Sequence, residues 1–134
     1  MATDPPLLLD GSALSIEDVV AVARRGRTVG VAPDVAQRLR AMRGRLDALT
    51  TDGNAYYGIN TGFGSLARTR LSSEKLRELQ ANLIRSHAAG VGEPLDEDIV
   101  RAMLLLLAAS LARGHSGVRP VVVDTIVAWL NAGL

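Results

Sequence analysis

The stretch from Ala102 to Ala109 reads Ala-Met-Leu-Leu-Leu-Leu-Ala-Ala and is apolar at every position. Asp96 precedes it as a candidate helix cap, and the Gly-rich segment from Arg113 to Gly117 follows it as a break. A helix that is apolar all round is expected to be buried among other helices. We therefore predict a mainly α-helical chain in which this segment has neighbours on every side.

Shorter elements are expected on the N-terminal side of this segment. Leu7 to Leu9 and Thr28 to Val31 are predicted to be short extended segments, since apolar β-formers there are bounded by turn residues. Ser15 can cap a helix that runs to about Arg25. Pro33 is placed to begin a longer helix of good helix formers, which should end near Gly53.

Two further helices complete the pattern. Ser72 or Ser73 can cap a helix whose leucines recur at helical spacing up to His87 and form one stripe. Pro120 suits the first turn of a final helix that contains Trp129, and Gly133 would suit the end of that helix. The fold class expected from the chain is thus helical with two short extended segments.

Composition narrows the class of protein. The 134 residues suffice for one domain, and because aromatic residues make up only 3% its core must be aliphatic. A formal net charge of +1 argues against a nucleic-acid or anionic-membrane partner. Without cysteine and with two histidines, a dedicated metal site is not expected. We find no secretory signal and no apolar run approaching the ~20 residues of a membrane span, so we expect a cytoplasmic protein.

Three of the four aromatic residues lie in one glycine-rich stretch, Tyr56-Tyr57-Gly-Ile-Asn-Thr-Gly-Phe-Gly64. Rings usually serve cores and interfaces, whereas glycine opens backbone conformations that are closed to other residues. The combination suggests a shaped flap that presents a phenol, with Tyr57 the better candidate. A phenol acts as a base near neutral pH only where positive potential stabilises the phenolate. The alternative is that Tyr56 and Tyr57 merely anchor an ordinary turn.

The two histidines admit two interpretations each. His87 lies on the leucine stripe, where a structural role is common, yet it also follows Ser86 just before the Gly90 break, where a side chain can face a cavity. A serine-hydrolase pair is excluded because adjacent residues on a helix do not face each other and no nucleophile elbow is present. His115 could bind a ligand, but a corner between two helices explains it as well.

Three motifs in order resemble the aromatic amino acid lyase family. They are Tyr57-Gly-Ile-Asn-Thr-Gly-Phe-Gly64, Leu79-Gln-Ala-Asn-Leu-Ile-Arg-Ser-His-Ala-Ala-Gly-Val-Gly-Glu-Pro-Leu95 and Arg113-Gly-His-Ser-Gly-Val-Arg-Pro120. The resemblance covers roughly residues 5 to 134 and is strongest to the amino-terminal part of the histidine ammonia-lyases. It implies that residues 1–134 form the N-terminal helical portion of that fold, with residues 1–6 flexible, an active-site loop at residues 51–71 and the C-terminal helical bundle absent.

The resemblance also implies a prosthetic group. Family members form 4-methylideneimidazol-5-one from an internal Ala-Ser-Gly, and this electrophile engages the substrate while a base removes a β-proton so that ammonia can leave. The 134 residues contain no Ala-Ser-Gly. We therefore expect this chain to be inactive alone and to need a complementary C-terminal part, self-association, or both. Family members form homotetramers with shared active sites.

Site residues can be carried over by motif. Tyr57 matches the loop tyrosine proposed as the base, and Gly64 matches a glycine that lines the site near the substrate. Ser86 and His87 match the pair that selects the substrate side chain, and Ser-His resembles the histidine-specific enzymes. Some tyrosine aminomutases also carry Arg-Ser-His at this point, although their loop usually differs from Ile-Asn-Thr-Gly-Phe-Gly.

The sequence therefore predicts the N-terminal part of an enzyme that converts L-histidine to urocanate and ammonia. The alternatives are a tyrosine or phenylalanine ammonia-lyase, an aminomutase of the same family, or a non-catalytic helical assembly domain. One departure favours the last: where the family commonly has a basic residue and an asparagine before the third motif, this chain has Leu107 and Ala109.

Overall fold

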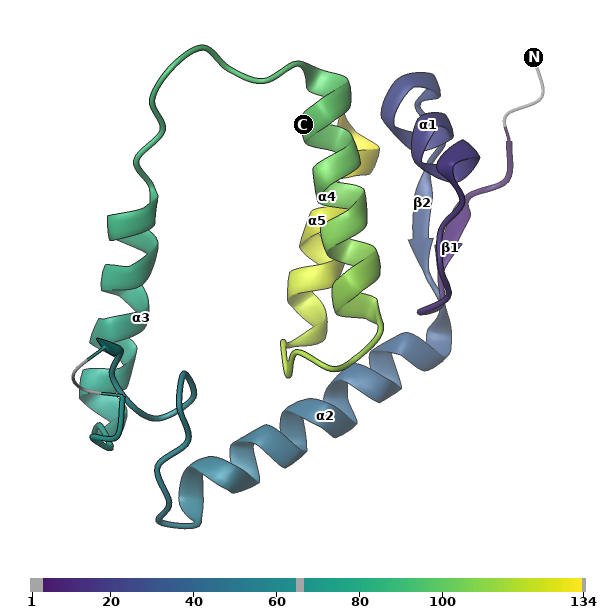
Figure 1. The fold of residues 1–134 in the computed structure, drawn as a ribbon. Helices are drawn as coiled ribbons and strands as arrows, with labels where there is room; N and C mark the ends of the chain where they lie inside the picture. The colour runs from purple at the N-terminus through teal and green to yellow at the C-terminus, as the bar shows by residue number, and fades with distance from the viewer. Residues whose placement is uncertain (1–3, 65–66, 134) are drawn as a thin grey trace. The chain divides into compact units, whose positions relative to one another are not determined.

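The computed structural model describes residues 4–64 and 67–133 and is drawn in Figure 1. Its contacts divide the chain into two compact units. Residues 1–45 and 94–134 are called here the core unit, and residues 46–93 the loop unit. The predicted flexible start and predicted loop extend over residues 1–3 and 65–66, which lie outside the described residues, as does Leu134.

The core unit begins with the two predicted extended segments, which pair as parallel strands. β1 (Leu7–Leu9) lies in register with β2 (Val29–Val31), so that Leu7 is opposite Val29. Parallel strands need a crossover connection, and α1 (Ile16–Arg25) provides it (Figure 1). The prediction of a helix that starts after Ser15 is confirmed, because Ser15 and Asp18 form a reciprocal capping box.

The core is aliphatic, as the low aromatic content predicts. α4 (Glu97–Ala112) packs between α1 and α5 (Pro120–Ala132), and the buried side chains of these helices meet those of the two strands and of α2 (Pro33–Thr51). The chain's tryptophan, Trp129, is instead half-exposed on α5. The fully buried leucine and valine side chains are Leu9, Val22, Val35, Leu39, Leu105, Val123 and Leu130.

Two expectations about α4 were wrong. The helix is not enclosed on every side: its outward face leaves Met103 58% exposed, and Leu106 and Leu107 are about half-exposed. An apolar side chain shows that a position can be buried, but burial also needs a neighbouring element to cover it. Asp96 stands at the N-cap position, yet its side chain makes no capping hydrogen bond.

Polar side chains tie the helix ends of the core unit together. The buried guanidinium of Arg101 donates to the carbonyl of Leu130 at 3.0 Å and to that of Val22 at 3.1 Å, near the C-terminal ends of α5 and α1. A cation is favourable there because helix C-termini carry partial negative charge. The amide of Asn131 donates to and accepts from the backbone of Val29, both at 2.8 Å, so it occupies the edge of β2.

The loop unit contains the end of α2, a long connection and α3 (Ser73–His87). Ser72 caps α3 by accepting from the backbone N–H of Lys75 at 3.3 Å, as predicted. The predicted stripe of Leu76, Leu79 and Leu83 is the less exposed face of the helix. No hydrophobic side chain among the described residues of this unit is buried.

The described helices include none that is both long and apolar enough to cross a bilayer. Within residues 4–64 and 67–133, no three His, Cys, Asp or Glu side chains gather as a metal site would require.

Candidate active site

The aromatic loop is built around a tight turn. The backbone N–H groups of Ile59 and Asn60 both donate to the carbonyl of Tyr56, at 3.1 and 3.2 Å. Gly58, inside this turn, has a φ of +72°, a conformation that costs other residues strain. The first glycine of the motif is therefore required by the backbone path, and the turn sets where Tyr57 emerges.

Asn60 holds the loop together from within and is only 3% exposed. Its Oδ1 accepts from the backbone N–H of Tyr56 at 2.7 Å, and its Nδ2 donates to the carbonyl of Asn54 at 2.8 Å. Its own carbonyl accepts from the N–H of Leu71 at 2.9 Å, which closes the base of the loop. Sequence reasoning missed this residue, although a short amide between glycines is a recognisable sign of side-chain to backbone bonding.

Tyr56 is an anchor. Its hydroxyl donates to the Asp52 carboxylate, which raises the pKa of Tyr56 above its ordinary value. The same hydrogen bond, with that from the Asn54 backbone, lowers the pKa of Asp52. A phenol whose proton is donated to a carboxylate is a poor base, so the anchoring interpretation holds for Tyr56.

Tyr57 is presented differently. It is 66% exposed, and its ring meets that of Phe63 edge to face, with centroids 6.0 Å apart and planes at 78°. Such a pairing steadies a ring without using its hydroxyl. Gly64 ends the motif with a φ of +58°, and a Cβ built on it would meet no described atom within 4 Å. The loop thus offers an accessible phenol beside a position with no side chain.

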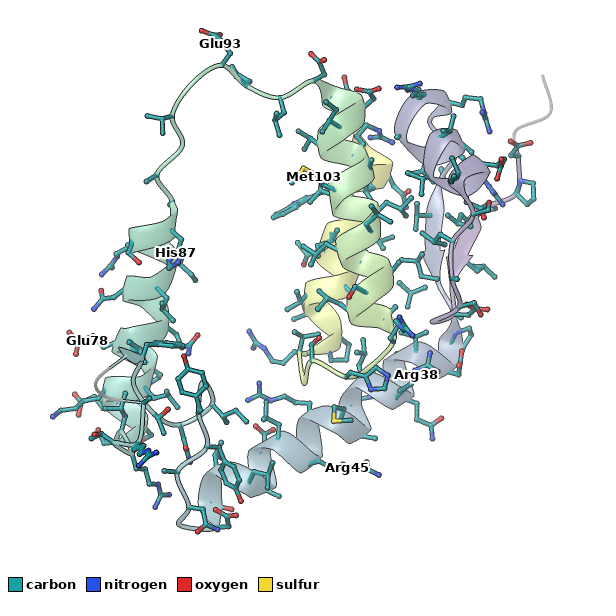
Figure 2. All side chains as sticks on the ribbon, viewed as in Figure 1. Arg38, Arg45, Glu78, His87, Glu93 and Met103 are labelled. Atoms are coloured by element: carbon teal, nitrogen blue, oxygen red, sulfur yellow. The ribbon has the colours of Figure 1, made fainter. Side chains whose placement is uncertain are left out.

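Ser86 and His87 lie at the end of α3, where Figure 2 labels His87. The imidazole Nδ1 is 2.9 Å from the carbonyl of Leu83 and 3.1 Å from Ser86 Oγ. Ser86 Oγ in turn donates to the Leu83 carbonyl at 3.0 Å. His87 is exposed, although it continues the leucine stripe, because the stripe reaches the last residue of the helix.

The structure brings some of the predicted residues together and not others. Ser86 contacts His87, and Tyr57 contacts Phe63, the ring just before Gly64. Within the described part of the chain, no hydrogen bond or ring contact joins Tyr57 to the Ser86 and His87 pair. His115 is exposed in the connection between α4 and α5, which agrees with the helix-corner interpretation.

The two departures from the family pattern lie on different faces of α4. Leu107 is half-exposed on the outward face, whereas Ala109 is partly buried and packs against the core. Both side chains therefore belong to the core unit, while Tyr57, Gly64, Ser86 and His87 belong to the loop unit.

Comparison with known proteins gives a consistent result. The family described as Aromatic amino acid lyase matches residues 14–134. Histidine ammonia-lyase of Sorangium cellulosum is 48% identical over an alignment of 127 residues, and the match covers 92% of this chain and 25% of that protein. This chain therefore spans about a quarter of the length of that relative.

Solved structures agree in fold. The crystal structure of tyrosine aminomutase from Streptomyces globisporus matches with a TM-score of 0.88 and 35% identity, over 96% of this chain and 24% of that one. Histidine ammonia-lyase from Trypanosoma cruzi matches with a TM-score of 0.83 and 38% identity, over 95% of this chain and 24% of that one. The resemblance predicted from the three motifs is confirmed: this chain belongs to the aromatic amino acid lyase family.

Proposed function

We propose that this chain is the loop-bearing N-terminal part of a cytoplasmic histidine ammonia-lyase, which eliminates ammonia from L-histidine to give urocanate once the rest of the enzyme is supplied. The observation that carries the proposal is His87, an exposed imidazole fixed at the end of α3 by Leu83 and Ser86. An imidazole at this position can exchange a hydrogen bond with the imidazole of the substrate. The identity to a histidine ammonia-lyase over nearly the whole chain supports the same assignment.

Tyr57 is proposed as the base. In its phenolate form, Tyr57 would accept the β-proton of the substrate at Oη, which is accessible on the loop, while the edge-to-face contact with Phe63 limits the ring's motion. Gly64 would let the substrate approach the backbone, since a Cβ there would meet no atom of the described residues within 4 Å. Ser86 and His87 would form the pair that selects the substrate side chain, with the imidazole of His87 facing it.

The family's electrophile, 4-methylideneimidazol-5-one, would make the amino group of the substrate a better leaving group. Its Ala-Ser-Gly precursor is not among the 134 residues. The residues of this chain therefore do not fit as its source, and the roles given above concern only binding and proton transfer.

Complementation tests the proposal. This chain would be mixed with the C-terminal part of the Sorangium cellulosum enzyme, starting after the matched segment, and urocanate formation followed by absorbance. We expect turnover of L-histidine by the mixture and none by either part alone. Preference for L-tyrosine or L-phenylalanine, or conversion to a β-amino acid, would instead favour the related lyases or aminomutases. Association without any turnover would favour an assembly domain.

A comparison of Tyr57→Phe with Tyr56→Phe tests whether Tyr57 is the base. Removing the Tyr57 hydroxyl should lower the kcat of the mixture at least ~100-fold, the usual contribution of a proton-transfer group. Removing the Tyr56 hydroxyl, which bonds to Asp52, should leave most activity. Equal effects of the two substitutions would contradict the assignment.

The partner is proposed from the outward face of α4. Ile99, Val100, Met103, Leu106 and Leu107 are exposed and share one side of the helix, because each residue turns it by ~100°. Beside them, a groove of about 300 Å³ between α1 and α4 is lined mostly by apolar side chains. Since the relatives are about four times as long, we propose that the complementary part of the lyase covers this face.

Charged substitutions on that face test the partner. Met103→Asp combined with Leu106→Asp should abolish complementation, because a buried interface would then hold unpaired carboxylates. Ile16→Asp is the control, since Ile16 is also exposed in the core unit but lies at the start of α1. Undiminished complementation by the double variant would refute the proposed surface. If the unmodified chain forms a dimer that the double variant dissolves, a second copy is the occupant.

A further inference from the structure

We propose that Ser86 is a positioning residue that acts through His87. With the Leu83 carbonyl it would hold the imidazole in the tautomer that carries hydrogen on Nδ1, so that Nε2 meets the ligand as a hydrogen-bond acceptor. The site would then select ring side chains that carry an N–H or O–H donor. Only this choice of ligand rests on the proposed function, because the tautomer is a property of the chain itself.

The Leu83 carbonyl decides the tautomer. A carbonyl oxygen can only accept, and His87 Nδ1 lies 2.9 Å from it. A lone pair on Nδ1 would face the lone pairs of the oxygen, whereas an N–H there makes a hydrogen bond. The neutral ring therefore keeps its single hydrogen on Nδ1, and which nitrogen is protonated follows from this local bond.

Ser86 adds to the same choice. Its hydroxyl has one hydrogen, which it donates to the Leu83 carbonyl at 3.0 Å. Only its lone pairs then face His87 Nδ1, 3.1 Å away, so they too favour a hydrogen on that nitrogen. Because its hydrogen is already donated within the helix end, Ser86 is assigned to orienting His87 and not to contacting substrate.

The fixed tautomer has a consequence for the ligand. Neutral Nε2 carries a lone pair and no hydrogen, so it can bind a donor and repels an acceptor. An imidazole N–H or a phenol O–H satisfies it, while an unsubstituted phenyl ring or a ring nitrogen without hydrogen does not. Leaving a polar atom unsatisfied in a closed site discriminates strongly between such ligands.

Nitrogen NMR of the 134-residue chain tests the tautomer directly. Long-range proton–nitrogen correlations distinguish the two neutral forms, and the spectrum would be recorded at a pH where both histidines are neutral. We expect His87 to show the Nδ1–H form. His115, the second histidine, supplies an internal reference in the same sample. A dominant Nε2–H form at His87 would overturn the proposal.

Variants of Ser86 distinguish a role in orienting His87 from a role only in stabilising the end of α3. Ser86→Ala should lower the ratio of Nδ1–H to Nε2–H about 2- to 12-fold, the range of one hydrogen bond, and Ser86→Thr should restore it. Asn82→Ala is the control: it removes a polar side chain that bonds to Arg85 and should leave the ratio unchanged. An unchanged ratio in Ser86→Ala would refute the role of Ser86.

The choice of ligand is tested in the complemented enzyme with two substrates, each an L-histidine methylated on a different ring nitrogen. The KM of each substrate is measured. Methylation of the nitrogen that donates to His87 should raise KM, and methylation of the other should have the smaller effect. Equal KM values for the two methylated substrates would contradict the assignment of Nε2 as acceptor. Absence of turnover with L-histidine would be a failure of the proposed function, whereas a wrong tautomer in the isolated chain would be a failure of this inference.

Discussion

Individual residues determine the local backbone path in both the loop unit and the core unit. The side chain of Asn60 forms hydrogen bonds with two backbone groups that would otherwise bind water. Gly114 leaves room for the side chain of Arg38, whose Cγ would lie 2.7 Å from a Cβ at that position. Neither residue is a candidate for catalysis. Both determine whether the segments that contain the family motifs can take their shape.

Replacing Asn60 should loosen the loop. In Asn60→Ala the backbone N–H of Tyr56 loses its acceptor, so its hydrogen exchange should accelerate about 10- to 100-fold. Amide exchange measured by NMR checks this. Asn54→Ala is the matched control, because it keeps the Asn54 carbonyl that Asn60 contacts. Unaltered exchange at Tyr56 would show that Asn60 does not hold the turn.

Gly114→Ala should destabilise the core unit by about 2–4 kcal/mol, since it combines a φ of +80° with a clash against Arg38. Gly26→Ala is the comparison, because Gly26 has a φ of +69° but open space around it, and should cost about 1 kcal/mol. Denaturant unfolding gives both values. Equal losses of unfolding free energy in the two variants would mean that the space left for the Arg38 side chain does not contribute to stability.

Whether the role of a single residue can be predicted from the sequence depends on whether that role comes from its own chemistry or from its contacts in the fold. Tyr57, Ser86 and His87 stand out because their side chains are chemically distinctive and lie in recognisable motifs. Asn60 and Asp52 do not, because their roles come from which backbone groups and hydroxyls fold against them. No composition or periodicity encodes the pairing of Asp52 with Tyr56.

Among the elements, α1 shows how a helix end responds to pH. The hydrogen bond from the Ser15 hydroxyl holds the pKa of Asp18 below its ordinary value of 3.8, with a further contribution from the Ser15 backbone. A carboxyl whose pKa is lower in the folded chain stabilises the fold above its unfolded pKa. That stabilisation is lost as the pH falls through the folded pKa.

Ser15→Ala should therefore raise the pKa of Asp18 towards 3.8 and make unfolding less steeply dependent on acid below about pH 4. Carboxyl carbon NMR titration measures the pKa. Asp10, whose pKa is lowered by Ser12, serves as the reference in the same variant and should not move. A pKa of Asp18 that stays low would show that Ser15 is not its main cause.

Helix and strand positions could largely be predicted, because caps and breakers act locally. Ser15, Ser72 and Pro120 each mark the helix start that the structure has. The enclosure of α4 could not be predicted, because no described element of the core unit covers its outward face. An all-apolar helix predicts that such an element exists without naming it.

At the scale of the whole molecule, apolar burial is unevenly distributed. Every buried hydrophobic side chain of the described residues lies in the core unit, and the buried residues among those described in the loop unit are Asn60, Thr61 and Gly62. The loop unit is thus ordered by hydrogen bonds and helix caps. Each is worth about 1 kcal/mol.

This distribution predicts that the loop unit opens at a lower free energy than the core unit does. Amides of α3 should exchange at least about 100-fold faster than those of α5, because opening the loop unit exposes little apolar surface. Hydrogen exchange followed by mass spectrometry resolves the two helices. Adding the complementary part of the lyase should slow exchange on the outward side of α4 if that surface is the interface. Uniform protection along the isolated chain would contradict this difference.

The separation of the core from the candidate site also bears on how such an enzyme changes over time. Substitutions at Tyr57, Ser86 or His87, which are all exposed, remove no buried methyl group, so they carry little of the penalty that most mutations impose on folding. Variants with new side-chain preference are therefore accessible one step at a time from the present sequence. A library confined to Tyr57 and residues 82–88, with Gly58, Asn60 and Thr61 kept, should yield mostly folded proteins, which makes these positions a practical starting point for directed evolution of substrate choice.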